Sequence, residues 1–204
     1  MLTLFHAPQS RSSRIVWLLE EIGADYDLRY VDIVRSMTGT GARDPANPHP
    51  DGKVPALAHK DAVVTESAAI ALYLTDLFPE AGLGASVGSA ERAAYVTWLA
   101  WTTGEMELAY WAKISGQADG DPAARARYDA VIARLFGALE RGPYLMGERF
   151  TAVDVLVGSA LARLRQFSPE SPLLDAYLAR IMDRPANAMA TARDGDLAGT
   201  VQAA

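Results

Sequence analysis

The first eighty residues switch between strand-like and helix-like spacing of their hydrophobic positions. Residues 2–5 predict a short strand, and residues 26–33, where aromatic and apolar positions alternate with polar ones, predict a second strand. The stretch between these strands has helical spacing at Ile15, Leu18, Leu19 and Ile22. Gly23 follows at once and suits a left-handed cap at the end of that helix. The chain is therefore expected to open with a β-α-β unit.

The following segment is irregular and then returns to regular spacing. Residues 34–52 are rich in Gly, Pro, Asn, Asp and Thr, which predicts an irregular connection with room for a short helix. Residues 54–65 predict a hairpin of two short strands around Lys60 and Asp61. Residues 66–78 return to helical spacing before Pro79.

Strand signals nearly vanish after residues 80–88, a Gly/Ser/Ala-rich stretch that predicts a linker between residues 1–79 and residues 89–204. Four helices are expected in the second part, and the residues after Ala190 are expected to be loose. The strongest start signal is Thr151 with Asp154, a capping-box pattern. The expected helices run from residue 89 or 90 to about 115, from 122, from 152, and from 172 to before Pro185.

Composition narrows the possible chemistry. The chain has 204 residues, half of them hydrophobic, and no cysteine, so disulfides, thiolate metal sites and a protein thiol nucleophile are excluded. The net charge of −6, with scattered Lys and Arg, argues against a nucleic-acid partner. Neither a secretory leader nor an apolar run of membrane-spanning length is visible, so we expect a cytoplasmic protein with no membrane partner.

Four short patterns, in this order and at this spacing, resemble the glutathione S-transferase family, and the first is most similar to its fungal and bacterial serine-type branch. The resemblance covers nearly the whole chain. It implies a thioredoxin-like N-terminal domain with a mixed four-stranded sheet, and an all-α C-terminal domain. The patterns are SRSSRIVWLLEE at residues 10–21, GKVPAL at 52–57, TESAAI at 65–70 and FTAVD at 150–154.

The family's chemistry requires that the thiol of glutathione be ionised, and a free thiol with a pKa of ~8.5 is mostly protonated at neutral pH. A hydroxyl donor and the positive end of a helix both stabilise a thiolate. Because Phe5 has no hydroxyl and cysteine is absent, the resemblance implies Ser10 as the activating residue, with Ser12 and Ser13 as alternatives. Ser10 could also be only a helix cap.

Two arginines lie where a helix N-terminus disfavours cations. Arg11 and Arg14 indicate a site that needs positive potential, or else two solvated side chains. We expect Ser10, Arg11 and Ser12 to be the catalytic residues.

The resemblance also implies the contacts that bind glutathione. The residue before a cis-proline, here Val54 before Pro55, offers its backbone to the cysteinyl part of glutathione, and Glu66 and Ser67 hold the γ-glutamyl end. Helix N-terminal amides favour the carboxylate there. The expected glutathione-binding residues are Ser10, Arg14, His49, Lys53, Val54, Pro55, Glu66 and Ser67. His6 and His59 are expected to be strand residues without chemistry.

The second substrate is expected to be a small apolar electrophile between the domains, facing Thr103, Met106 and Tyr110. The resemblance implies a homodimer, with glutathione as co-substrate, no tightly bound cofactor and no metal. Two other functions remain open. One is a non-catalytic protein that binds glutathione or apolar ligands, since fold does not guarantee activity. The other is a glutathione-dependent disulfide reductase that uses a second glutathione in place of a protein cysteine.

Overall fold

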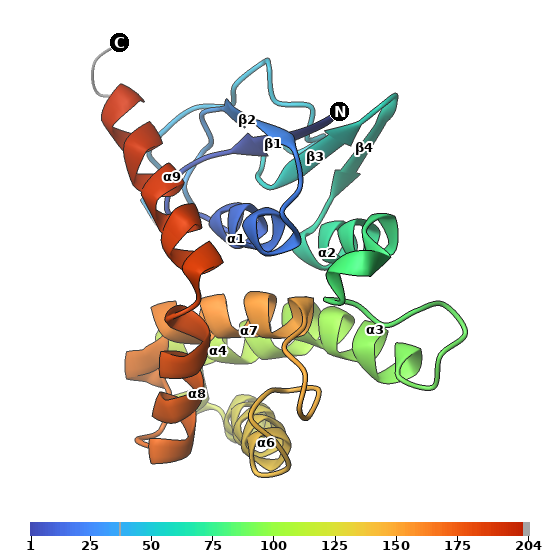
Figure 1. Ribbon diagram of the computed structural model, residues 1–204. Coiled ribbons are helices and arrows are strands. Elements are labelled where there is room, and N and C mark those ends of the chain that lie inside the picture. Colours follow the sequence, from blue (N-terminus) through green and yellow to red (C-terminus); the bar gives the residue numbers. More distant parts are fainter. Residues whose placement is uncertain (37, 202–204) are drawn as a thin grey trace. The chain divides into compact units, whose positions relative to one another are not determined.

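The computed structural model describes residues 1–36 and 38–201, and the described chain forms two compact units (Figure 1). Unit 1 comprises Met1–Ala81 together with the segment that begins at Arg184, and unit 2 comprises Gly82–Asp183. The division differs from the expected boundary in one respect. The segment after residue 183 belongs to the unit that holds the sheet and not to the helical one.

Unit 1 is built on a mixed sheet of strands in the order β2-β1-β3-β4. β1 pairs in parallel with β2, whereas β3 is antiparallel to both β1 and β4. This is the four-stranded thioredoxin-like sheet that the sequence predicted. The strands are β1 (Leu2–His6), β2 (Tyr26–Tyr30), β3 (Ala56–His59) and β4 (Ala62–Thr65).

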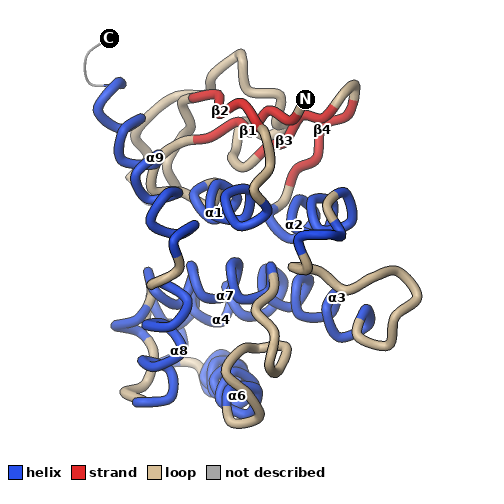
Figure 2. The backbone as a smooth tube through the Cα atoms, in the orientation of Figure 1, coloured by secondary structure: helices blue, strands red, loops and turns tan. Residues whose placement is uncertain are grey.

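Two helices lie on one side of this sheet, α1 (Ser13–Ile22) and α2 (Ser67–Leu77), followed by a short 3-10 turn, η1 (Pro79–Ala81) (Figure 2). Gly23 ends α1 with a φ of 69°, as its position predicted. The predicted hairpin is also confirmed. No helix or strand forms in the described part of residues 34–52, so the short helix allowed there is not found.

Unit 2 begins with helices α3 (Arg92–Trp101) and α4 (Glu107–Ile114), where the sequence predicted one long helix. They are joined by a π-helical turn, η2 (Thr102–Met106), and followed by the unpredicted short helix α5 (Gln117–Gly120). α6 (Pro122–Leu139) has Pro122 in its first turn and Asp121 as N-cap, as predicted.

The predicted capping box is also confirmed in unit 2. The Thr151 hydroxyl accepts a hydrogen bond from Val153 N, and Asp154 accepts one from Thr151 N, so that α7 (Ala152–Arg163) starts at Ala152. The unit ends with the 3-10 turn η3 (Arg165–Phe167) and α8 (Pro172–Met182).

No helix in the part of the chain that the structure describes is long and apolar enough to span a bilayer.

The expectation of a loose tail after Ala190 was wrong for residues 191–201, because α9 (Pro185–Val201) continues through them. Residues 202–204, which the same expectation covered, lie outside the described residues. α9 packs on α1 within unit 1 (Figure 1). Arg184 Nε lies 2.6 Å from Glu21 Oε1, and Arg193 Nε lies 3.0 Å from Glu20 Oε1. These ion pairs and the buried Ala190 hold the helix in place. Because the contact does not depend on a broad apolar stripe, hydrophobic periodicity did not indicate this helix.

Candidate functional site in the turn between β1 and α1

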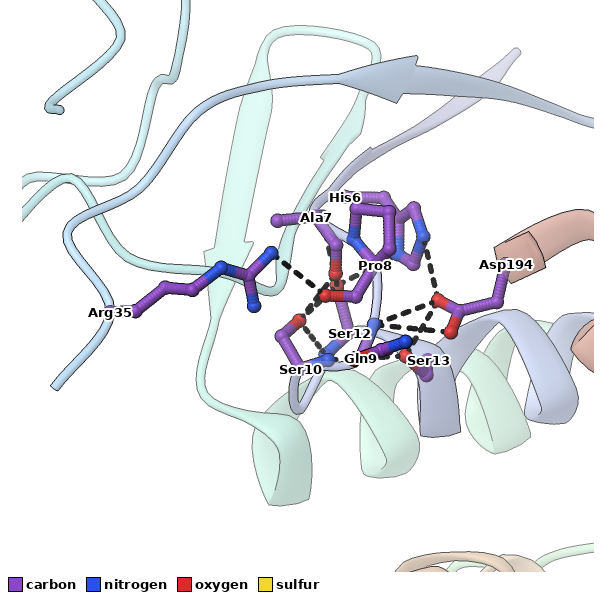
Figure 3. A network of polar contacts seen from close by, with 9 residues as sticks. All are labelled: His6, Ala7, Pro8, Gln9, Ser10, Ser12, Ser13, Arg35 and Asp194. Carbon is purple, nitrogen blue, oxygen red and sulfur yellow. Dashed lines mark hydrogen bonds and ion pairs between the residues drawn. The ribbon is translucent and has the colours of Figure 1, made fainter. Parts of the chain in front are cut away.

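The turn from Ala7 to Ser12 joins β1 to α1 and gathers hydroxyl groups at the N-terminus of the helix (Figure 3). Gln9 has a φ of 53°, which non-glycine residues rarely adopt, and Arg35 Nη2 donates a hydrogen bond to Pro8 O at 3.0 Å. Ser12 is the N-cap residue of α1, yet its hydroxyl caps no amide of the helix. The turn is therefore shaped by contacts other than ordinary helix capping.

The three serines of this turn have different environments. Ser12 is fully buried, and its Oγ lies 2.8 Å from His6 Nδ1 and 2.7 Å from Ser10 Oγ. Ser13 Oγ donates a hydrogen bond to Asp194 Oδ1 at 2.8 Å. Ser10 is half-buried, and its Oγ lies 2.7 Å from Ala7 O and accepts a hydrogen bond from Ser12 N at 3.1 Å. Among these serines, Ser10 therefore combines solvent access with a hydroxyl that is not bound to Asp194.

The carboxylate of Asp194 reaches this turn from α9, a helix that belongs to the same unit (Figure 3). It accepts hydrogen bonds from Gln9 N and Ser13 Oγ, and its Oδ1 lies 3.0 Å from His6 Nε2. The contact with His6 lies outside in-line hydrogen-bond geometry, so it is mainly a contact between charges or dipoles. Burial acts to raise the pKa of Asp194, but the donors His6, Ser13 and Gln9 N outweigh it and hold this pKa below its ordinary value.

Asp194 and His6 lie at this turn but were not among the expected site residues. His6 was expected to have no chemistry, whereas it is completely buried at the end of β1 with a polar group at each ring nitrogen. A buried polar side chain that ends a strand beside a serine-rich turn was the available signal. Asp194 gave no local signal, because it lies 181 residues after Ser13.

The two arginines of the expected site differ in exposure. Arg11 is exposed, whereas Arg14 is 7% exposed within α1. Both remain predicted site residues, and burial makes Arg14 the more fixed of the two.

The loop before β3 carries the expected backbone contact for a ligand. The Val54–Pro55 peptide bond is cis, and Val54 packs in a small apolar cluster with Phe5 and Val31. Lys53 is exposed, and its Nζ lies 3.2 Å from Asp51 Oδ2. These residues belong to unit 1, as do Ser10 and Ser67.

His49 has a structural place in the same loop. It is buried, and its Nδ1 accepts a hydrogen bond from Asp51 N at 3.0 Å. The backbone N–H of His49 donates to Asn47 Oδ1. Asn47 in turn donates to Lys53 O at 3.0 Å. This geometry favours a role in holding the loop over the expected contact with a ligand carboxylate.

Glu66 and Ser67 form a second unusual helix start. Glu66 precedes α2 with a φ of 69°, a conformation that costs about 1–3 kcal/mol outside glycine, and its side chain caps no amide. Ser67 is 2% exposed, and its Oγ has no hydrogen-bond partner within the described residues. An unpaired buried hydroxyl at an uncapped helix N-terminus suits an anionic ligand.

The residues expected to face the electrophile are mostly internal to unit 2. Met106 is fully buried, and Tyr110 is 1% exposed, with its hydroxyl 2.7 Å from Ser168 Oγ and its ring packed edge-on against Tyr128. These two side chains therefore serve as packing residues, in contrast to their expected place on a pocket wall. Thr103 is half-buried and keeps some exposed surface.

Comparison with known proteins agrees with both units. Residues 1–76 match the N-terminal domain of glutathione S-transferases, and residues 122–183 match their C-terminal domain. The chain is 29% identical over 161 residues to glutathione S-transferase GstA of Escherichia coli O157:H7, covering 78% of this chain and 80% of that protein. It is 30% identical over 209 residues to the disulfide-bond oxidoreductase YfcG of E. coli K12, covering 93% and 94%.

Solved structures give the same result. A glutathione S-transferase from Actinobacillus pleuropneumoniae superimposes with a TM-score of 0.82 at 27% identity, covering 96% of this chain and 93% of that one. A sphingomonad glutathione S-transferase solved in complex with glutathione gives a TM-score of 0.78, also at 27% identity, with coverages of 95% and 98%. The chain belongs to the glutathione S-transferase family.

Proposed function

We propose that the protein is a glutathione transferase that binds glutathione on unit 1 and transfers its thiolate to a small apolar electrophile. Its family supports the reaction class, and one structural relative was solved with glutathione bound. The proposal assigns glutathione the part of co-substrate, with no tightly held cofactor.

The observation that carries the proposal is Ser67. Among the residues that the structure describes, its buried hydroxyl has no hydrogen-bond partner at the start of α2, where the strained Glu66 supplies no cap. A buried hydroxyl left unpaired costs about 1–3 kcal/mol, and an anion at a helix N-terminus removes that cost. We assign this position to the α-carboxylate of the γ-glutamyl group, with the Glu66 carboxylate available to its ammonium.

The sulfur of the same ligand is assigned to Ser10. Its hydroxyl donates to Ala7 O at 2.7 Å, and a thiolate is a better acceptor than a neutral carbonyl because a charged partner strengthens the bond. The N-terminus of α1, which lacks a side-chain cap, adds positive potential. Each unit by which the thiol pKa falls corresponds to ~1.4 kcal/mol of stabilisation of the anion.

The remaining glutathione contacts stay predictions from the family resemblance. The backbone of Val54 before Pro55 is assigned to the cysteinyl part, and Lys53 to the glycine carboxylate. Arg11 and Arg14 contribute positive potential. His49 is retained as a residue that shapes this loop, because its Nδ1 is occupied by Asp51 N.

The partner substrate and the assembly are also proposals. We assign the apolar electrophile to unit 2, where Thr103 is the expected pocket residue with exposed surface. A homodimer is expected from the family resemblance, and we propose a cytoplasmic location.

Ser10→Ala tests the assignment, with Ser10→Thr as the variant that keeps a hydroxyl. Conjugation of a chlorodinitrobenzene and of an unsaturated aldehyde is followed by absorbance, and glutathione binding by calorimetry. We expect Ser10→Ala to lose most conjugation while retaining glutathione affinity, and Ser10→Thr to regain part of the rate. Equal activity of Ser10→Ala and wild type would place the sulfur elsewhere. A wild type that binds glutathione but turns over no electrophile would indicate a binding protein.

A disulfide reductase is the second candidate, because the relative with 93% coverage of this chain is named a disulfide-bond oxidoreductase. The chain has no cysteine, so both sulfurs needed for reduction must come from two glutathione molecules. The first would attack the substrate disulfide and the second would resolve the mixed disulfide. Turnover of a dithiol-forming substrate faster than conjugation would favour this activity.

A further inference from the structure

A line of polar groups leads from α9 to the exposed edge of the β1–α1 turn. Asp194 Oδ1 lies 3.0 Å from His6 Nε2, His6 Nδ1 lies 2.8 Å from Ser12 Oγ, and Ser12 Oγ lies 2.7 Å from Ser10 Oγ (Figure 3). His6 and Ser12 are 0% exposed, so bulk water does not interrupt the line. Ser10, at its end, is half-buried.

Asp194 favours one direction along this line when His6 is neutral. The ionised carboxylate of Asp194 can only accept, so the facing nitrogen, Nε2, carries the ring proton and Nδ1 is an acceptor. Ser12 Oγ then has two acceptors within reach, His6 Nδ1 at 2.8 Å and Ala7 O at 3.1 Å, and the shorter contact is the one to His6. The Ser12 oxygen accepts from Ala7 N at 3.2 Å and has one lone pair left. The Ser10 hydroxyl, which donates to Ala7 O at 2.7 Å in the free protein, lies 2.7 Å from the Ser12 oxygen and reaches this lone pair by rotating about its Cβ–Oγ bond. After this rotation both hydroxyls point inward along the line that ends at His6 Nδ1.

We infer that His6 accepts the thiol proton of glutathione through Ser10 and Ser12, and that Asp194 prepares His6 for this by fixing its tautomer. The inference rests on the proposed function, in which the thiol lies at Ser10. Ser10 is the residue that touches the sulfur, whereas the other three groups act through it.

The proton transfer balances without any further reactant. The S–H bond breaks as the proton passes to Ser10 Oγ, Ser10 passes its own proton to Ser12 Oγ, and Ser12 passes its own to His6 Nδ1. The thiolate keeps the electron pair of the S–H bond. Afterwards each hydroxyl points outward, so that Ser10 donates to the thiolate. Once sulfur has bonded to the electrophile, the proton returns along the same line to the product, the leaving group or solvent.

The groups around His6 identify its imidazole as the final acceptor of the proton. Asp194 faces it from α9, and the Tyr30 ring from β2 packs edge-on at 6.2 Å between centroids. Burial raises the pKa of Tyr30, the nearby Arg35 lowers it, and Asp194 and Asp32 raise it further, so that it stays above its ordinary value. The phenol is therefore protonated at neutral pH and cannot take the proton. The carboxylate of Asp194 stabilises the imidazolium that forms in this buried position.

Asp194 has a second, mechanical role that an experiment must separate. It also binds Gln9 N and Ser13 Oγ, and thereby holds the turn in place. Arg193 offers a matched control, because this neighbouring side chain also ties α9 to α1 through Glu20, and its guanidinium lies over the Tyr26 ring in the described part of the chain. Arg193→Gln weakens the helix contact and leaves the line from Asp194 to Ser10 intact.

The test is a count of protons during glutathione binding at neutral pH. Thiolate formation is followed by ultraviolet absorbance, and proton release is obtained by calorimetry in buffers of different ionisation enthalpy. In the wild type we expect thiolate to form while roughly one proton per thiolate fails to reach the buffer, because it resides on His6. Arg193→Gln is expected to give the same count, and circular dichroism checks the fold of each variant.

Two variants interrupt the relay at different points. Ser12→Ala removes the middle hydroxyl without changing α9. In this variant the proton can no longer reach His6, so each thiolate that forms is expected to release its proton to the buffer. Asp194→Asn is expected to raise the thiol pKa of bound glutathione by ~1 unit, which lowers the thiolate fraction roughly tenfold well below that pKa. If Asp194 were merely a negative charge beside the helix end, its removal would raise the thiolate fraction instead. The expected sign therefore separates the two roles.

Release of one proton to the buffer per thiolate in the wild type, or an unchanged count in Ser12→Ala, would overturn the relay and leave Ser10 as a simple donor. Failure of the proposed function looks different. In that case the wild type would bind no glutathione, or would bind it without forming thiolate, or Ser10→Ala would leave the thiolate fraction unchanged.

Discussion

Replacing Ser67 by alanine should stabilise the free protein and weaken its binding of glutathione. The hydroxyl is 2% exposed and has no hydrogen-bond partner among the described residues, so its removal eliminates an unpaired buried group. Such a group costs about 1–3 kcal/mol, and a net gain near 1 kcal/mol is expected once the small lost contact volume is included. In the complex the same hydroxyl would donate to a carboxylate, a bond worth about 1.5–3 kcal/mol.

That loss predicts a dissociation constant roughly 10- to 100-fold higher, because each 1.4 kcal/mol is about tenfold. Binding linkage turns this change into a stability difference. At a glutathione concentration 100 times the wild-type dissociation constant, the ligand stabilises the wild type by about 2.7 kcal/mol. The same concentration should stabilise Ser67→Ala by only about 0.4–1.4 kcal/mol.

Urea unfolding with and without glutathione, together with calorimetric titration, measures both effects. Thr75→Val is the matched control on the same helix, because its buried hydroxyl donates to Ala71 O at 2.9 Å. This isosteric change should lower the free energy of unfolding by ~1 kcal/mol and leave glutathione affinity unchanged. The reasoning is refuted if Ser67→Ala destabilises the free protein as Thr75→Val does, or if its dissociation constant equals that of the wild type.

Two further predictions concern carboxylates in the two units. Asp154→Ala should lower the free energy of unfolding by about 3–5 kcal/mol in urea titrations. The substitution leaves Leu145 N and the Tyr177 hydroxyl without their acceptor and also removes the cap of α7. The control variant Asp121→Ala, at the less buried cap of α6, should lower it by only ~1 kcal/mol. Equal losses in these two variants would contradict this difference. The lowered pKa of Asp194 means that its contribution is complete above the ordinary value of 3.8 and is lost as the pH falls through the lowered pKa. Asp194→Asn should therefore destabilise the protein more at pH 7 than at about pH 3, and the same difference at both pH values would count against this assignment.

The elements that sequence analysis located correctly have strong local signals. Thr151 and Asp154 form a capping box that leaves few alternatives for the start of α7, and the alternating residues from Tyr26 identify β2. The order of strands and helices was therefore predictable from local signals, whereas the mixed pairing of the four strands came from the family resemblance. The π-helical turn at Thr102–Met106 was not, because an extra residue in a helical turn changes the hydrophobic spacing very little.

The functional site was only partly predictable, for a different reason. Ser10 and Ser67 lie in short patterns that the sequence displays directly. The turn that carries Ser10 also depends on Asp194, far away in the chain, whose carboxylate accepts a hydrogen bond from Ser13 Oγ and faces His6. Asp194 lies on α9, a helix with small side chains and a weak apolar pattern. Periodicity therefore gave no reason to place it beside α1.

Unit 1 takes its last helix from a segment that is synthesised only after the whole of unit 2. During translation the sheet and α1 can form early, but the turn that carries Ser10 lacks its Asp194 contact until α9 has left the ribosome. A fragment that stops at Ala81 would accordingly lack the clamp on its own reactive turn. The turn that carries Ser10 therefore gains its contact with Asp194 only after the whole of unit 2 has been synthesised.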